Sequence, residues 1–283
     1  MRVAAFQFDI ERAPLDGSSV ELRAAVQRNV EAVLAGLAEA AGDGVRLVLL
    51  PELWSTSFVA AAGPFGDVAR LPELMEAVGE AQVAVTAAAD RAGLALAGST
   101  LGLEPGEELP RNRFWLHDSG AELLRYDKAH LFTPTAEHLA FSAGAALPTV
   151  AELDGLRIAG LVCYDLRFSA PLEALHREAC DLVLVPAQWP VTRVGHWSAL
   201  LAGRAAATQA FVLGANRTGS EVIGRRGTLL EFPGASALHS PAGVAPVVGP
   251  PAAGLVSADL DGELPGQLRR QVPVQRDRRA DLV

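Results

Sequence analysis

The chain has 283 residues, of which 50% are hydrophobic and 20% charged, with a formal net charge of −9 and a pI near 5.2. This acidic balance argues against a nucleic-acid-binding surface, and no apolar run approaches the roughly 18 residues of a membrane-spanning helix. Residues 1–6 resemble a strand rather than a signal peptide, so we expect a soluble, cytoplasmic protein with neither nucleic acid nor membrane among its partners.

Strands and helices are predicted to alternate along the first half of the chain. Strands are expected over residues 2–8, 45–50 and 94–99. Helices are expected from a capping box at Ser18 and Glu21 to about Gly42, and over residues 71–92. Residues 112–118 and 122–128 flank a turn signal, as do residues 149–153 and 156–163, so each pair predicts a β-hairpin.

The second half continues with a helix near residues 171–179, a strand at 182–186, a helix near 196–208 and a strand at 210–215. Residues 236–240 and 255–260 resemble a further strand pair. We expect a C-terminal arm from about residue 263, extended from Pro273 onward. Because no repeat or linker interrupts the chain, we predict one domain over residues 1–283, with two mixed sheets packed face to face and helices outside.

Three predicted strands end in a polar residue that is unusual for a buried sheet edge. Glu52 follows the strand at 45–50, Lys128 ends the strand at 122–128, and Cys163 ends the strand at 156–163. If these strands are neighbours, a carboxylate, an ammonium and a thiol lie together. That set is chemically complete for acyl transfer, with a base for the thiol proton, a nucleophile, and a cation for the developing oxyanion.

Lys128 is the only lysine in a chain with 24 basic residues. Arginine is bulky, planar and always charged, whereas the lysine ammonium is a compact point charge. A single lysine in an arginine-biased sequence therefore indicates a position that arginine cannot fill, although chance is the competing interpretation. Cys180 precedes a predicted buried strand, and we interpret it as a packing residue.

The chain resembles the nitrilase superfamily of carbon–nitrogen hydrolases over nearly its whole length. The resemblance is carried by Leu50-Pro51-Glu52, residues 126–132, Glu137, residues 163–168, Trp189-Pro190, His196-Trp197, Arg204-Ala205, Gln209, Asn216-Arg217 and Pro241-Ala242-Gly243. It implies a four-layer α-β-β-α sandwich, a homodimer or larger homo-oligomer, and no cofactor. The run Cys-Tyr-Asp-Leu-Arg-Phe at residues 163–168 is most similar to the ω-amidase and deaminated-glutathione-amidase branches.

The same resemblance implies roles for individual residues. Glu52 would be the base, Lys128 the oxyanion partner and Cys163 the nucleophile, and Glu137 would be a second acid that positions the lysine and the substrate. The backbone N–H of Tyr164 would complete the oxyanion hole. The expected reaction is hydrolysis of a small carboxamide to an acid and ammonia through a cysteine thioester.

Other residues have more than one interpretation. Trp189 and Phe58 are candidate pocket walls, with core packing equally plausible, and His196 lines the pocket or lies on a surface helix. His130 and His138 lack a third ligand at metal spacing, so no metal is expected. If the substrate carries a carboxylate, Arg193, Arg204 or Arg217 is available to bind it, and the sequence does not choose between them.

Alternative functions remain at this stage. Hydrolysis of an N-carbamoyl amide or of a nitrile uses the same residues, and a catalytically silent binding protein is a different class. The intact set of Glu52, Lys128, Glu137 and Cys163 argues against the silent protein.

Overall fold

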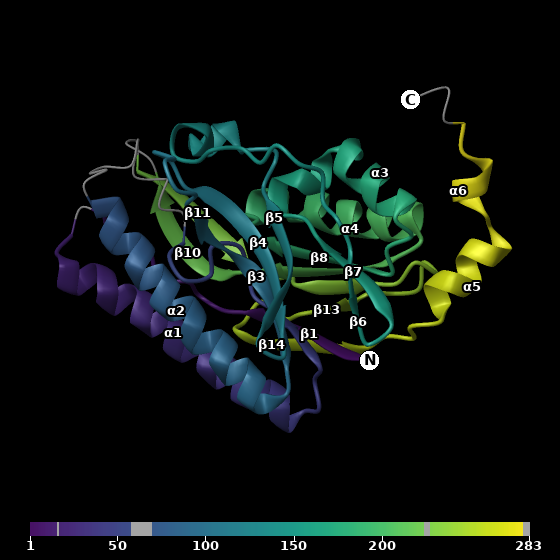
Figure 1. Cartoon of the computed structure of the whole chain (residues 1–283), viewed down its shortest axis with the longest axis horizontal. Coiled ribbons are helices and arrows are strands. Elements are labelled where there is room, and N and C mark those ends of the chain that lie inside the picture. The colour runs from purple at the N-terminus through teal and green to yellow at the C-terminus, as the bar shows by residue number, and fades with distance from the viewer. Residues whose placement is uncertain (16, 58–69, 224–226, 280–283) are drawn as a thin grey trace.

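Two six-stranded mixed sheets form the centre of the computed structural model, which describes residues 1–15, 17–57, 70–223 and 227–279 (Figure 1). The first sheet has the order β14 (Gly254–Asp259), β1 (Arg2–Gln7), β2 (Leu47–Leu49), β3 (Ala95–Gly102), β4 (Arg111–Asp118) and β5 (Ala121–Asp127). The second has the order β13 (Val247–Val248), β12 (Ala237–His239), β9 (Phe211–Asn216), β8 (Leu182–Ala187), β7 (Leu156–Gly160) and β6 (Ala151–Leu153).

Both sheets have the same internal plan. Strands β1, β2 and β3 are parallel, as are β7, β8 and β9, and antiparallel strands flank each parallel set. Because the carboxyl ends of parallel strands share one edge of a sheet, each parallel set presents a common edge for functional side chains.

Helices cover the outer face of each sheet. The long helices α1 (Ser19–Gly42) and α2 (Leu71–Ala92) pack on the first sheet, and α3 (Ser169–Arg177) and α4 (Val194–Thr208) pack on the second. Figure 1 shows α1 and α2 side by side on one side of the strands, with α3 and α4 on the other. The predicted four-layer α-β-β-α sandwich is confirmed.

Alternation along the central strands explains their continuous apolar sequence. In β2, Leu47 and Leu49 face the second sheet, while Val48 packs into the core beneath α1 and α2. In β8, Leu182 and Leu184 face the first sheet, while Val183 packs under α3 and α4. A strand buried on both faces has no polar face, so the period-two signal disappears from its sequence.

The two sheets approach each other closely where Phe114 of β4 packs against Gly160 of β7. A Cβ atom built on Gly160 would lie 2.2 Å from Phe114 Cε1, which is far below any tolerable contact. Gly160 is therefore required for the close approach of the sheets directly before the segment that carries Cys163.

Most of the predicted elements are present, and the Ser18–Glu21 capping box at the start of α1 is confirmed. The hairpin over Asp154 and Gly155 is also confirmed, and both turn residues have positive φ, as a type I′ turn requires. The predicted strand at 156–163 is shorter, because β7 ends at Gly160 and a 3-10 turn, η5 (Cys163–Arg167), follows.

The predicted pairing of residues 236–240 with residues 255–260 is wrong. Strand β12 pairs with β9 in the second sheet, whereas β14 pairs with β1 in the first sheet. Each parallel set leaves one edge open, at β1 and at β9, and these late strands satisfy the two open edges separately. A further hairpin of β10 (Thr218–Ile223) and β11 (Thr228–Pro233) was not predicted.

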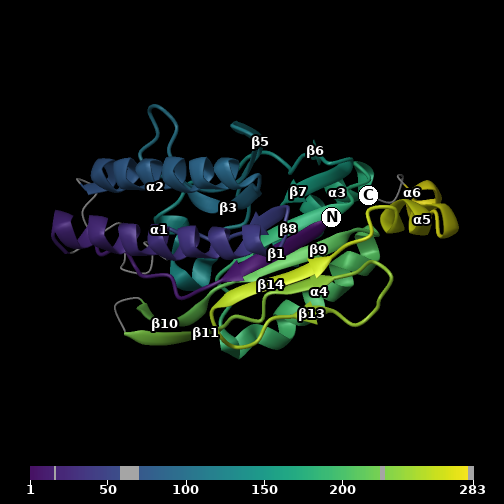
Figure 2. The ribbon, with the colours of Figure 1, turned by 90° about the horizontal axis from the view of Figure 1, so that it is seen from below.

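Two helices lie within residues 264–277 of the C-terminal tail, so the prediction of an extended arm is wrong there. Helices α5 (Leu264–Gln271) and α6 (Val274–Asp277) return the chain to α3, where Gln275 donates to Arg177 O at 2.7 Å and Arg278 pairs with Glu173. Figures 1 and 2 place these helices at the end of the molecule opposite the β10–β11 hairpin. Within the described residues, no helix is long and apolar enough to cross a membrane.

Candidate active site

Glu52, Lys128 and Cys163 come together across both sheets rather than along one sheet. Glu52 follows β2 and Lys128 follows β5, with β3 and β4 between these strands, and Cys163 follows β7 of the facing sheet. The three strands are therefore not neighbours in one sheet, although their ends do converge. The cluster forms where the carboxyl ends of the two sheets face each other.

The ammonium of Lys128 lies between two buried carboxylates. Its Nζ is 2.8 Å from Glu52 Oε1, 2.8 Å from Glu137 Oε1 and 2.9 Å from Glu137 Oε2. All three side chains are at most 2% exposed. Glu137 lies in η4 (Glu137–Leu139), and its Oε2 also accepts a hydrogen bond from the Phe132 N–H at 2.5 Å.

Two residues that the sequence did not single out hold the Glu52 carboxylate. Asn112 of β4 donates from Nδ2 to Glu52 Oε1 at 2.8 Å and to Glu137 Oε1 at 3.4 Å. The N–H of Gln188 donates to Glu52 Oε2 at 3.0 Å, and Gln188 Nε2 donates to the Glu52 main-chain oxygen at 2.8 Å. The available sequence signals were a buried-strand asparagine and a glutamine directly after the apolar strand β8.

Cys163 occupies a strained turn. It is the first residue of η5 and has φ of 45°, a left-handed conformation that non-glycine residues rarely adopt. The residue is half-buried, and it packs against both the core between the sheets and the core beneath α3 and α4. Glu52, Lys128 and Glu137 are at most 1% exposed, so Cys163 is the most exposed residue of the four.

The electrostatics favour a protonated thiol at rest. Burial raises the pKa of Cys163 well above its ordinary value, and the charge of Glu52 raises it further, while Lys128 and the Gln188 N–H oppose this shift. Burial also raises the pKa of Glu52, against the lowering effect of Lys128. Burial alone would lower the pKa of Lys128, but the charges of Glu137 and Glu52 outweigh it and keep the ammonium protonated.

A third buried carboxylate, that of Asp165, braces the turn around Cys163. Asp165 accepts hydrogen bonds from Tyr126 Oη at 3.0 Å and from the His130 N–H at 2.9 Å, and its Oδ1 lies 2.7 Å from His130 Nδ1. The His130 ring stacks on Phe168 with ring centroids 3.7 Å apart. These contacts give Asp165 and His130 a structural role at the turn.

The remaining predicted site residues are distributed around this cluster. Tyr164 is half-buried between the rings of Phe132 and Phe168. Trp189 is buried, and its indole N–H donates to Arg193 O at 2.8 Å. His196 is exposed on α4 beside Arg167, with Nδ1 3.1 Å from Arg167 Nη2, and Phe58 lies outside the described residues.

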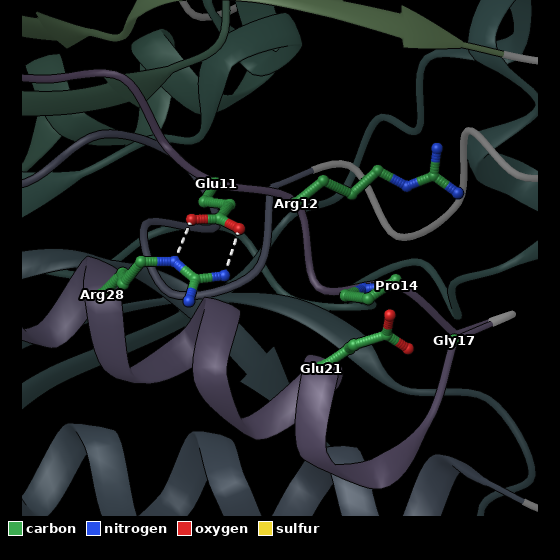
Figure 3. Close-up of a pocket in the computed structure, with 6 residues that line it drawn as sticks. All are labelled: Glu11, Arg12, Pro14, Gly17, Glu21 and Arg28. Atoms are coloured by element: carbon green, nitrogen blue, oxygen red, sulfur yellow. Dashed lines mark hydrogen bonds and ion pairs between the residues drawn. The ribbon is translucent and has the colours of Figure 1, made fainter.

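A polar hollow at the start of α1 is separate from this cluster (Figure 3). It has a volume of about 560 Å³ and is lined by Glu11, Arg12, Pro14, Gly17, Glu21 and Arg28. Glu11 and Arg28 pair with each other, and Glu21 belongs to the capping box, so most of its charges are already used. Across the described parts of the chain, no group of three or more His, Cys, Asp or Glu side chains could hold a metal ion.

Comparisons with known proteins agree on one family. The family model described as carbon–nitrogen hydrolase matches residues 2–270. A 2-oxoglutaramate amidase of Bacillus subtilis is 32% identical over 237 residues, which cover 83% of this chain and 86% of that protein. The ω-amidase YafV of Escherichia coli K12 is 39% identical over 183 residues, which cover 63% of this chain and 64% of that protein.

Solved structures agree with this result. The crystal structure of an amidase from Nesterenkonia sp. is 28% identical, has a TM-score of 0.78, and covers 98% of this chain and 95% of that chain. Other structures of the Nesterenkonia amidase carry acrylamide, or the acetamide moiety of fluoroacetamide, added to the active-site cysteine. A cysteine at the active site of that enzyme is thus reached by small amides.

Proposed function

The chain belongs to the carbon–nitrogen hydrolase family and hydrolyses the C–N bond of a small carboxamide, and on this premise we propose that Cys163 is its nucleophile, Glu52 its general base and Lys128 its oxyanion donor. The observation that supports this assignment is the buried contact of Lys128 with Glu52 and Glu137, beside the strained, partly accessible Cys163. Lys128 is also the only lysine in the sequence.

The first half of the reaction forms a thioester. Cys163 gives its proton to Glu52 as its sulfur attacks the amide carbon, because the raised pKa of the thiol requires a base at the moment of attack. The raised pKa of Glu52 suits a group that accepts this proton and then donates it to the departing nitrogen. Ammonia leaves as the tetrahedral intermediate collapses to the acyl-enzyme.

Lys128 stabilises the negative charge on the carbonyl oxygen during this step. Its ammonium has three N–H donors. One N–H is shared by the two oxygens of Glu137 and a second donates to Glu52, so the third is left for the oxyanion. The backbone N–H of Tyr164 supplies a second donor from the start of η5. Donors fixed in a buried site stabilise charge more than donors in water.

The second half consumes water. Glu52 removes a proton from a water molecule, which attacks the thioester carbon, and the released thiolate takes up the proton as the acid product departs. Glu137 fixes the ammonium and is itself held by the Phe132 N–H, so it acts as a positioning residue for Lys128. The cycle needs no cofactor.

The substrate that we propose is the terminal amide of a dicarboxylic acid. Two relatives support this choice by their names, a 2-oxoglutaramate amidase and an ω-amidase. We further propose a pocket wall from Trp189 and Phe58, a cytoplasmic location, and a homodimer or larger homo-oligomer, as the resemblance implies.

Ammonia release by the purified protein tests this function. The panel contains butyramide, succinamate, 2-oxoglutaramate, an N-carbamoyl amino acid and an aliphatic nitrile, each measured beside Cys163→Ala. We expect the natural protein to hydrolyse the amides and Cys163→Ala to be inactive on them. Activity of Cys163→Ala equal to that of the natural protein would remove Cys163 from the mechanism, and activity confined to the nitrile or the carbamoyl compound would overturn the substrate class.

A further inference from the structure

A substrate with a free carboxylate needs a cation near the reacting centre, and the sequence offered three arginines for this task. The contacts of Arg204, Arg217 and Arg193 differ sharply in the structure. Because a guanidinium that already donates to protein acceptors must break or share those bonds to bind a ligand, the contacts discriminate between the three. This inference rests on the proposed amidase function.

Arg204 is committed to the turn that carries Cys163. From α4 it donates from Nε to Leu166 O and from Nη2 to Arg167 O, both at 3.1 Å. These oxygens belong to the last residues of η5, which have no partner within the turn. Arg204 therefore holds the end of the turn, and binding of a substrate carboxylate would compete with these two bonds.

Arg217 is committed to a buried ionic network. It is 1% exposed, and its Nη1 donates to Glu221 Oε2 at 2.8 Å and to Gln188 Oε1 at 3.0 Å. Its Nη2 donates to Asp9 Oδ1 at 2.9 Å and to Ile10 O at 2.7 Å. With two carboxylates already paired to it and no access to solvent, Arg217 is excluded as a substrate receptor.

Arg193 is different. It ends the short turn η6 (Val191–Arg193), is half-buried, and its guanidinium lies over the ring of Phe132 at 5.6 Å. Among the described residues, no acceptor bonds to this guanidinium and no carboxylate lies within 4.0 Å of it. A cation that lies over an aromatic face and has no acceptor within the described part of the chain is prepared to bind an anion.

Contacts link Arg193 to the reacting centre. The Phe132 ring beneath it meets the ring of Tyr164 edge-on at 5.0 Å, and Tyr164 directly follows Cys163. The Phe132 N–H also binds Glu137, the partner of Lys128. Cys163, Tyr164, Phe132 and Arg193 are all half-buried, whereas Glu52, Lys128 and Glu137 are buried. Arg193 is thus connected to Cys163 through the rings of Phe132 and Tyr164 and, like them, is partly exposed.

Arg167 is a fourth arginine near Cys163, at the end of η5, and it has other contacts. Its guanidinium lies over the Trp189 ring at 5.0 Å, and its Nη2 is 3.1 Å from His196 Nδ1 on the exposed face of α4. Its place is thus fixed by a histidine and an indole, and it serves as a comparison for Arg193.

We propose that Arg193 binds the distal carboxylate of the substrate and so makes the enzyme selective for ω-amides over neutral amides. The planar guanidinium presents two parallel N–H donors that match a carboxylate, and the Phe132 face limits its orientation. A neutral amide of the same length leaves these donors unpaired, which lowers its kcat/KM relative to that of the acid amide.

The test compares two substrates of similar length, succinamate with a distal carboxylate and butyramide without one. The measured quantity is the ratio of their kcat/KM values in the natural protein, Arg193→Gln, Arg193→Lys, Arg167→Gln and Arg177→Gln. Arg177→Gln is the control, because Arg177 is exposed on α3 and its replacement removes the same unit of charge elsewhere. Loss of one hydrogen-bonded charge pair corresponds to about a 10- to 100-fold fall in this ratio.

We expect this fall in Arg193→Gln, a smaller fall in Arg193→Lys, and no change in Arg177→Gln. Raised ionic strength should lower the ratio of kcat/KM for succinamate to that for butyramide in the natural protein. The ratio in Arg193→Gln should not change with ionic strength. An unchanged ratio in Arg193→Gln, with both amides still hydrolysed, would overturn the role of Arg193 while leaving the amidase function intact. Failure of the natural protein to hydrolyse either amide would instead count against the proposed function. A fall in Arg167→Gln alone would transfer the role to Arg167.

Discussion

Glu52 and Gln188 hold each other through two hydrogen bonds that cross from one sheet to the other. The Gln188 N–H donates to Glu52 Oε2 at 3.0 Å, and the Gln188 side chain donates from Nε2 to Glu52 O at 2.8 Å. One bond orients the carboxylate of the proposed base and the other fixes its backbone. Gln188 Oε1 in turn accepts from Arg217, so the buried ionic network extends to the base.

Removal of the Gln188 side-chain bonds should lower both activity and stability. Gln188→Met keeps the main-chain N–H that donates to the Glu52 carboxylate. It removes the side-chain bonds to the Glu52 main-chain oxygen and to the Arg217 guanidinium, which lowers the unfolding free energy by about 1–3 kcal/mol. Urea unfolding and kcat on butyramide measure the two effects. Gln209→Met is the matched control, because Gln209 Nε2 donates to Val272 O at 2.9 Å beside the C-terminal helices. Gln209→Met should be less stable than the natural protein but have the same kcat. If Gln188→Met also has the kcat of the natural protein, Gln188 has no positioning role.

Replacement of Lys128 should nearly abolish turnover. Lys128→Arg keeps the charge, but the guanidinium does not fit between Glu52 and Glu137 in a fully buried site. We expect kcat to fall by at least the roughly 10²–10³-fold that one oxyanion donor contributes. Steady-state ammonia release measures this effect, and near-normal kcat in Lys128→Arg would exclude Lys128 as the oxyanion donor.

Lys128→Met should also give a protein whose stability depends strongly on pH. Loss of the ammonium removes the charge that lowers the pKa of Glu52, so burial raises that pKa further. Between the unfolded and folded pKa values the folded state then binds more protons than the unfolded state, so the unfolding free energy falls as pH rises through this window. Urea midpoints between about pH 5 and pH 8 measure the slope. A midpoint that rises with pH more steeply than in the natural protein would contradict this coupling.

The pKa of Cys163 is predicted to depend on Glu52. Burial and the Glu52 charge both raise it, so alkylation by iodoacetamide should accelerate only above the ordinary thiol pKa of about 8.5. In Glu52→Gln the charge is absent, and the midpoint of the rate against pH should move to lower pH. Cys180 is an internal control, because burial raises its pKa to about 12 and it should remain unmodified in the folded protein. An identical midpoint in both proteins would show that Glu52 does not act on the thiol.

Gly160→Ala should destabilise the fold through a clash between the sheets. The added methyl group would lie 2.2 Å from Phe114 Cε1, and overpacking of this kind costs about 1–3 kcal/mol or more. The double variant with Phe114→Leu should recover part of this loss. Gly203→Ala in α4 is the control, because its methyl group meets nothing within 4 Å and should stabilise the helix by about 0.5–1 kcal/mol. Thermal or urea unfolding of the four proteins checks the prediction, and a stable Gly160→Ala would mean that the sheets separate readily at this point.

Local features of the fold were predictable from the sequence. The capping box at Ser18, the turn at Asp154 and Gly155, and the apolar run at Leu47–Leu49 each depend on residues adjacent in the chain. The lone lysine and the thiol after an apolar strand likewise identified Lys128 and Cys163 as candidates. These inferences hold because capping, turn geometry and side-chain alternation are short-range properties.

The tertiary structure decided which of these pieces meet. Hydrophobic alternation shows which face of a strand is buried but not which strand lies beside it, so the sequence did not separate β12 from β14 or place Glu52 and Cys163 in facing sheets. Asn112 and Gln188 acquire their contacts with Glu52 only when the two sheets pack. The hydrogen bonds that hold the guanidinium groups of Arg204 and Arg217 arise in the same way. Hydrogen bonds of this kind depend on tertiary packing, which no local sequence pattern encodes.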